Sequence, residues 1–182
     1  MKNGKEDIEW LVLASTDEKM LLISKYALTC MPYNKSIEAV DVTWETSSLR
    51  TWLNTKFYEE VFSSEEKKRI LSTNVENGNE QGHSGARTEG GNDTTDNVFL
   101  ISYKEMNENF EDYEDLLCQA TRYYIAQDGF VDSDTGYVRW WLRSPGLRQS
   151  EALCIDEEGE YITMIAFNSS LAVRPAVWIK FN

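Results

Sequence analysis

The stretch "YVRWWLRSPG" (residues 137–146) places two adjacent tryptophans between two arginines and ends in a Ser-Pro-Gly turn. Its β-branched and aromatic residues, followed by turn residues, predict a β-strand. Side chains alternate along a strand, so Trp141 shares one face with Arg139 and Arg143. The other face carries only apolar residues, which are Val138, Trp140 and Leu142. The strand is therefore either a core strand with unusually large side chains or a strand that presents one face to a ligand.

The last stretch, "SLAVRPAVWIKF" (residues 170–181), repeats this pattern in a second predicted strand. Arg174 and Trp178 share one face of it. The opposite face is again purely apolar and consists of Val173, Val177, Ile179 and Phe181. Pro175 has no backbone N–H to donate to a neighbouring strand, so we expect it at a bulge or on an edge strand.

The faces that carry arginine and tryptophan have two interpretations, because arginine both stacks on tryptophan and donates planar hydrogen bonds. In the first, Arg143 and Arg174 are internal latches that bind loop carbonyls or acidic side chains, since buried polar groups are normally satisfied within the protein. In the second, these arginines and Trp141 belong to a surface that contacts a ligand. Core packing is the prediction for the large apolar rings of Trp52, Trp140 and Trp178.

Further strands are predicted on both sides of the chain's middle. Residues 8–14 and 20–26 form an opening β-hairpin, and their nearly continuous apolar character indicates burial on both faces. Residues 97–102 are another apolar run and predict a buried strand. Residues 151–167 predict a second hairpin, which turns at residues 156–159.

Short helices are predicted between these strands from apolar spacing and capping residues. Residues 46–48 are candidate caps for a helix whose apolar positions i, i+3 and i+4 are Leu49, Trp52 and Leu53. The pattern S-x-x-E predicts helix starts at Ser63 and Ser102. A last helix is predicted to end at Gly129. The fold class is therefore α+β, one domain over residues 1–182 with a mixed or antiparallel sheet and two to four short helices.

Residues 76–93 predict a long mobile loop, because they are rich in Gly, Asn and polar residues and have no apolar period. The single histidine, His83, lies in this loop. A general base must be held at a fixed place, so the sequence argues against a His-based catalytic triad and a His-rich zinc site.

Composition excludes several classes of partner. The 182 residues are 41% hydrophobic, which is enough for one core, and carry a net charge of −13. With no basic stripe, we expect no nucleic acid partner. No apolar run approaches about 18 residues, so we expect no membrane insertion. No apolar signal segment follows the N-terminus, which predicts a cytoplasmic protein as written, or an extracytoplasmic one if this is a fragment of a longer chain.

Metal and cofactor sites are not expected. The three cysteines are widely spaced and form no CxxC pattern. Residues 128–136 resemble the start of a calcium loop but lack a glutamate at the distance that an EF-hand requires, and the acidic residues 156–160 are interpreted as a hairpin turn. Residues 104–117 carry six carboxylates against one lysine. They are interpreted as a solvated helix face, with a site for a cation or a basic partner as the alternative.

Seven motifs, in order along the chain, resemble a family of Gram-positive bacterial domains known as domain of unknown function 6273. They are "IEWLVL", "LLISKYALTCMPYN", "VTWETSSLRTWLN", "FSSEEKKRI", "TTDNVFLIS", "WWLRSPG" and "VRPAVWI". The resemblance covers nearly the whole chain and implies an architecture. It carries no assigned activity.

The opening hairpin, the two helical segments and the closing "VRPA" strand are also similar to the C-type lectin-like fold, in its formylglycine-generating and retroelement-diversified branch. This resemblance implies that the first and last strands pair, with residues 9–13 beside residues 176–180. The catalytic cysteine pair of formylglycine-generating enzymes has no counterpart here. In the diversified relatives, ligands contact the segment that corresponds to residues 147–170. The implied contacts are Arg148, Gln149, Tyr161, Phe167 and Asn168.

The sequence therefore predicts a non-enzymatic recognition module that binds a protein or glycan through the loops after "WWLRSPG". No catalytic residue, metal or cofactor is predicted. The alternatives are a structural cell-surface assembly module and a carboxylate-based hydrolase, for which Glu45, Glu158 and Glu160 are the candidate acids. The complete predicted ligand site is Trp141, Arg143, Arg148, Gln149, Tyr161, Phe167, Asn168 and Arg174.

Overall fold

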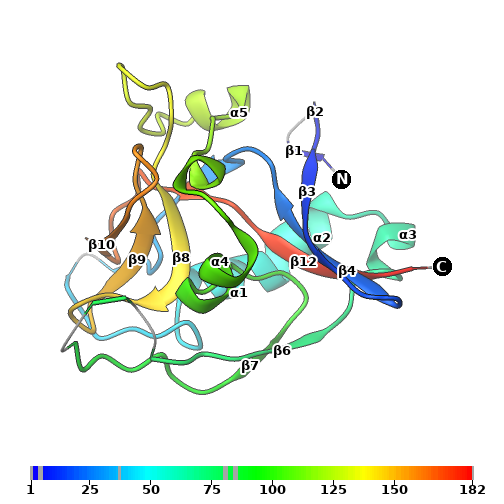
Figure 1. The fold of residues 1–182 in the computed structure, drawn as a ribbon, viewed down its shortest axis with the longest axis horizontal. Helices are drawn as coiled ribbons and strands as arrows, with labels where there is room; N and C mark the ends of the chain where they lie inside the picture. Colours follow the sequence, from blue (N-terminus) through cyan, green and yellow to red (C-terminus); the bar gives the residue numbers. More distant parts are fainter. Residues whose placement is uncertain (1, 4–5, 37, 80–81, 84–85, 182) are drawn as a thin grey trace.

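The structure, a computed structural model, describes residues 2–3, 6–36, 38–79, 82–83 and 86–181 and is a mixed α+β domain with short helices, as predicted. A five-stranded mixed sheet has the order β10-β9-β8-β11-β5, and a three-stranded antiparallel sheet has the order β12-β4-β3. Figure 1 shows the five-stranded sheet on the left and the three-stranded sheet on the right. The strands of the first sheet are β5 (Thr29–Cys30), β8 (Trp140–Pro145), β9 (Glu151–Ile155), β10 (Tyr161–Ile165) and β11 (Ala172–Val173).

The three-stranded sheet consists of β3 (Trp10–Ser15), β4 (Lys19–Ser24) and β12 (Ala176–Lys180). Two small two-stranded ladders complete the β-structure. They are β1 (Lys2–Asn3) with β2 (Glu6–Asp7), and β6 (Thr73–Val75) with β7 (Thr94–Asp96).

The prediction that the first and last strands pair is wrong. β12 pairs with β4, from Ala176 opposite Ile23 to Lys180 opposite Lys19. β3 pairs with the other edge of β4. The central position explains the burial of Leu21, Leu22 and Ile23, whereas Val12 on the edge strand β3 is 59% exposed. Burial on both faces was therefore predicted correctly for β4 and wrongly for β3.

The closing strand is split in two at Arg174 and Pro175. β11 pairs in parallel with β8 and antiparallel with β5, whereas β12 belongs to the other sheet. Figure 1 shows this last segment crossing from one sheet to the other. Pro175 lies between the strands, neither at a bulge nor on an edge strand, and its carbonyl accepts a hydrogen bond from the Ser24 amide at 2.9 Å. A residue without an N–H suits this gap, because no ladder passes through it.

The predicted helix starts are confirmed. Ser47 caps the first helix by accepting a hydrogen bond from the Arg50 amide, and capping boxes begin helices at Ser63 and Ser102. A continuous helical stretch contains α1 (Ser48–Trp52), the π-helix η1 (Leu53–Phe57) and α2 (Tyr58–Val61). The remaining helices are α3 (Ser64–Lys67), α4 (Tyr103–Asn109), the 3-10 helix η2 (Tyr113–Leu116) and α5 (Arg122–Ile125).

Two predicted elements in the middle of the chain differ from the structure. The helix expected to end at Gly129 is the single turn α5, because Gln119 and Ala120 are extended and form β-bridges. Residues 98–101 are buried as predicted, yet they form one bridge, Phe99 with Ala176, and no strand. In both places, contacts with distant segments determine the backbone conformation and override the element that the local sequence pattern predicts.

A buried carboxylate, Asp96, connects the first helix to the β6–β7 hairpin. It is 1% exposed and accepts hydrogen bonds from Arg50 Nε at 2.7 Å and Trp44 Nε1 at 2.9 Å. Thr94 Oγ1 donates a third bond at 2.7 Å. A buried charge requires such partners, so this network determines where the hairpin meets the helix.

Replacing this carboxylate tests the network. Asp96→Ala leaves the Trp44 N–H buried without an acceptor and removes the partner of Arg50. The free energy of unfolding should fall by about 2 to 4 kcal/mol, measured by urea denaturation. The control is Glu59→Ala, which removes an exposed ion pair with Lys67. It should cost less than about 1 kcal/mol. Equal losses in the two variants would contradict the role assigned to Asp96.

Candidate functional site

The β8 strand, which contains the two adjacent tryptophans, is buried on both faces and is therefore part of the core. Trp140 and Trp141 are both fully buried. The Trp140 indole donates to the Leu116 carbonyl at 2.9 Å, and the Trp141 indole donates to the Met31 carbonyl at 3.0 Å. Trp141 was a predicted ligand contact, but its ring lies inside the protein, where no ligand reaches it.

Arg143 is a buried latch that joins three segments to β8. Its Nη1 donates to the Leu100 carbonyl at 2.7 Å and forms an ion pair with Glu105, and its Nη2 donates to the Glu76 carbonyl at 3.0 Å. Its own carbonyl accepts a hydrogen bond from the Tyr33 hydroxyl at 2.8 Å. These contacts support the first of the two interpretations, that of internal latches. Arg143 nevertheless also lines a cleft.

Arg174 is a second latch, and it lies deeper. It is 1% exposed, donates from Nε to the Ser24 carbonyl at 2.8 Å, and stacks on Trp140 with 4.9 Å between the guanidinium and the ring centre. Burial lowers the pKa of Arg174. It does not line the cleft that Arg143 lines. The structure therefore separates these two predicted site residues.

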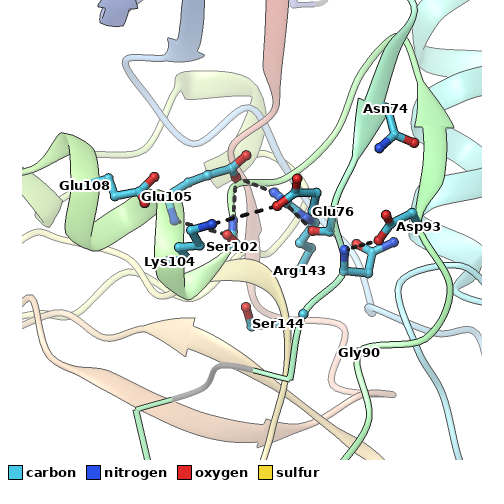
Figure 2. Close-up of a pocket in the computed structure, with 12 residues that line it drawn as sticks. Asn74, Glu76, Gly90, Asp93, Ser102, Lys104, Glu105, Glu108, Arg143 and Ser144 are labelled. Carbon is cyan, nitrogen blue, oxygen red and sulfur yellow. Dashed lines mark hydrogen bonds and ion pairs between the residues drawn. The ribbon is translucent and has the colours of Figure 1, made fainter.

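The cleft beside Arg143 is an open polar hollow with a volume of about 420 Å³. The β6–β7 hairpin and its connecting loop form one wall, α4 forms the other, and the end of β8 lies between them. Figure 2 shows Glu105 and Glu108 on α4 facing Asp93 and Asn74 on the hairpin. The lining residues are Asn74, Glu76, Asn77, Gly78, Gly90, Asp93, Ser102, Lys104, Glu105, Glu108, Arg143 and Ser144.

The four carboxylates of the cleft differ in how firmly hydrogen bonds and ion pairs hold them. Glu105 is held by the Ser102 amide at 2.9 Å and by the latch Arg143. Asp93 accepts a hydrogen bond from a backbone amide, that of Asn77, at 3.0 Å. Glu76 forms a loose ion pair of 3.8 Å with Lys104 from the opposite wall. The carboxylate of Glu108 has no hydrogen bond or ion pair within the described residues.

The structure brings four of the predicted site residues together. Two lie in the turn between β8 and β9, and two lie in the turn that follows β10. The Ala166 amide donates to the Ser150 carbonyl at 3.0 Å, which places the turn at Phe167 and Asn168 beside the turn at Arg148 and Gln149. The Arg148 side chain is 81% exposed. Phe167 is 39% exposed.

Two of these four side chains are used inside the protein. Gln149 Nε2 donates to the Val42 carbonyl at 3.0 Å and to the Glu89 carbonyl at 2.8 Å, and Gln149 Oε1 accepts a hydrogen bond from the Glu89 amide. Asn168 Oδ1 accepts hydrogen bonds from the amide and hydroxyl of Ser170. The sequence could not show the contacts of Gln149, because its partners lie 60 and 107 positions away, whereas the partner of Asn168 is only two positions away.

Tyr161 lies apart from the other predicted contacts, at the opposite end of β10 from Phe167. Its ring lies 5.0 Å from that of Tyr103 and 5.4 Å from that of His83, and its hydroxyl donates to the Gly82 carbonyl at 3.3 Å. Gly82 and His83 belong to the predicted loop over residues 76–93. The described part of this loop has no helix or strand, and residues 80–81 and 84–85 lie outside the described residues.

The cleft was not predicted as a site. Glu105 and Glu108 belong to the acidic run at residues 104–117, whose alternative interpretation was a cation or basic partner. Glu76 and Asp93 come from the two ends of the predicted loop, and no sequence signal relates them to that run. The candidate acids of the hydrolase hypothesis, Glu45, Glu158 and Glu160, are not among the lining residues. Within the described ranges, no group of three or more His, Cys, Asp or Glu side chains could hold a metal ion.

Arg139, just before β8, forms an ion pair that predicts a pH dependence of stability. Its Nε and Nη2 contact Glu157 at 2.5 and 2.6 Å. These hydrogen bonds lower the pKa of Glu157 from its ordinary value of 4.5. A lowered pKa in the folded state adds stability that is present above the ordinary value and is lost as the pH falls through the folded value.

Glu157→Gln should therefore lower the free energy of unfolding at pH 7, and its difference from the wild type should shrink as the pH falls below 4.5. Urea titrations between about pH 3 and 7 measure this difference. Glu158→Gln, an exposed neighbour in the same turn, is the control and should follow the wild type at every pH. A difference for Glu157→Gln that stays constant with pH would contradict the assignment.

Comparison with protein families assigns the chain to one family. No helix in the described part of the chain is long and apolar enough to cross a membrane. Neither a curated protein nor a solved structure matches the chain. The family described as domain of unknown function (DUF6273) matches residues 17–181, which include the five-stranded sheet, strands β4 and β12 of the three-stranded sheet, the cleft and the closing turns. The chain therefore belongs to this family.

Proposed function

We propose that the protein is a non-enzymatic recognition module whose loop surface binds a protein partner. The loop surface consists of residues 38–42, 147–150 and 166–168. One observation carries the proposal, which is that exposed apolar side chains occur on all three of these segments. Val40 is 42% exposed, Leu147 is 48% exposed and Phe167 is 39% exposed. Exposed apolar groups that gather on one surface are typical of interaction sites.

Hydrogen bonds between the three segments hold this surface in place. The Val42 amide donates to the Gln149 carbonyl at 2.9 Å, in addition to the bond from the Gln149 side chain to the Val42 carbonyl. The Ala166 amide donates to the Ser150 carbonyl. A surface that is already ordered loses less conformational entropy when a partner binds, which favours affinity.

The partner is a protein rather than a glycan because of which groups remain available. A sugar is recognised largely through hydrogen bonds from side chains such as amides. The amide of Gln149 and the carboxamide oxygen of Asn168 are already bound within the protein. The exposed side chains of the loop surface include the apolar Val40, Leu147 and Phe167 and the charged Glu38, Asp41 and Arg148. Exposed apolar side chains beside charged ones, with an arginine among them, are typical of a protein interface.

The resemblance to the C-type lectin-like fold supports a recognition role less directly than the exposed apolar side chains do. A C-type lectin-like fold of the formylglycine-generating and retroelement-diversified branch would place ligand contacts on these same turns. The split between β11 and β12, and the position of β4 between β3 and β12, differ from the strand pairing that this resemblance implies. A structural cell-surface assembly module would use the same loop surface, and the identity of its partner would distinguish the two roles.

A carboxylate-based hydrolase is the second candidate, because four carboxylates line one cleft. Glu105 and Asp93 already accept hydrogen bonds from the protein, so Glu76 and Glu108 would have to act as the catalytic pair. Hydrolysis of a polysaccharide or peptide library that is lost in Glu108→Gln would establish this function in place of the first.

The loop surface is tested by photo-crosslinking in cells that naturally express the protein. A benzophenone amino acid at Leu147 should form an adduct with one dominant protein. The same group at Val12, which is 59% exposed on β3, is the matched control and should not form this adduct. Adding Phe167→Asp to the Leu147 probe should abolish the adduct without unfolding the domain, since Phe167 is exposed.

Identical adducts at both positions, or no protein adduct at Leu147, would contradict the proposal. A glycan array run with the purified domain distinguishes the remaining case. Glycan binding that Phe167→Asp abolishes would retain the surface and replace the protein partner by a sugar.

A further inference from the structure

We propose that the cleft between α4 and the β6–β7 hairpin binds an organic cation that carries several amino or guanidino groups, such as a basic peptide segment. This site is separate from the loop surface and does not depend on the function proposed for it. Glu76, Asp93, Glu105 and Glu108 face the cleft against two cations, Lys104 and Arg143. The charge of Arg143 is already satisfied by Glu105 and by two backbone carbonyls.

Asn77 supplies evidence for a ligand that is independent of the acidic residues. It lines the cleft and is 8% exposed. Its Nδ2 donates to the Asn92 carbonyl at 2.8 Å, which fixes the orientation of the carboxamide. Its Oδ1 is buried and has no hydrogen-bond partner in the described part of the chain. A buried acceptor without a donor is costly, and a donor supplied by a ligand would satisfy it.

The lining of the cleft therefore suits a ligand that donates hydrogen bonds. The free carboxylates and the Asn77 oxygen are acceptors only, whereas ammonium and guanidinium groups are donors only. Arg143 Nε also has no hydrogen-bond partner among the described residues, but this guanidinium lies over the ring of Phe99, with 5.8 Å between its carbon and the ring centre. The net charge of −13 adds a long-range field that attracts cations to the protein.

Two other ligand classes fit the cleft poorly. A metal ion needs several ligands that converge, and the described residues hold no such group of carboxylates, cysteines or histidines. A sugar usually stacks on an aromatic ring, and none of the lining residues is aromatic. The volume of about 420 Å³ is far larger than one ammonium group and accommodates a long side chain with neighbouring backbone.

Lys104 shows how a ligand cation would be held. Its ammonium group extends from α4 toward Glu76 on the opposite wall, where the N–O distance is 3.8 Å (Figure 2). Both side chains are more than half exposed, at 53% and 74%. Lys104 therefore competes with a ligand for Glu76 and adds an opposing charge. Removing it should therefore strengthen binding.

Calorimetric titration of the full chain at low salt tests this proposal with two probes, spermidine and a short peptide of lysine and arginine. Glu108→Gln should weaken binding about three- to fivefold, and Glu76→Gln with Glu108→Gln about tenfold or more. Lys104→Gln should tighten binding about three- to fivefold. Glu60→Gln, an exposed glutamate on α2, is the matched control and should leave the affinity unchanged.

The pattern of results also identifies the source of the cation. Binding of the peptide alone indicates a basic protein segment, and binding of both probes indicates that spaced amino groups suffice. The Phe167→Asp variant, without the crosslinking amino acid, should bind both probes with the affinity of the wild type. This result would separate the cleft from the loop surface. No binding of either probe, or an equal loss in Glu60→Gln and Glu108→Gln, would overturn the proposal.

Discussion

A guanidinium that is removed from water must find acceptors and a countercharge within the protein, and Arg143 imposes this requirement at the centre of the fold. It lies on β8, the middle strand of the five-stranded sheet, and is 4% exposed. The carbonyls of Leu100 and Glu76 and the carboxylate of Glu105 meet it there. The extended segment before α4, the N-terminus of α4 and the end of β6 are thus brought to one point. The walls of the cleft are a consequence of this arrangement.

The internal use of polar side chains also explains why the two candidate sites differ. Gln149 and Asn168 use amide groups to stabilise the closing turns, and the apolar side chains of Val40, Leu147 and Phe167 are exposed on the loop surface. In the cleft, the latch uses Glu105 and leaves Glu76 and Glu108 near the solvent. One surface is therefore suited to an apolar partner, and the other is suited to a cation.

Local interactions were the predictable part of the structure. Both capping boxes involve residues three positions apart, so Ser63 and Ser102 marked their helix starts correctly. The turn at residues 156–159 was equally local. Strand order was not predictable, because β12 pairs with β4 across 150 or more positions and no residue of β12 encodes that choice. The same reason applies to the cleft, whose walls come from separate segments, and to Trp141, whose burial depends on Met31 and Tyr33.

Amide hydrogen exchange in Arg143→Lys tests the central claim most directly. Lysine keeps the positive charge but cannot donate to several acceptors in a fixed plane. The claim predicts faster exchange at residues 77, 103, 105 and 106, whose amides are held by partners around the latch. The amides of β3, β4 and β12 should exchange as in the wild type. Unchanged exchange around the cleft, or equal acceleration in every strand, would contradict the account.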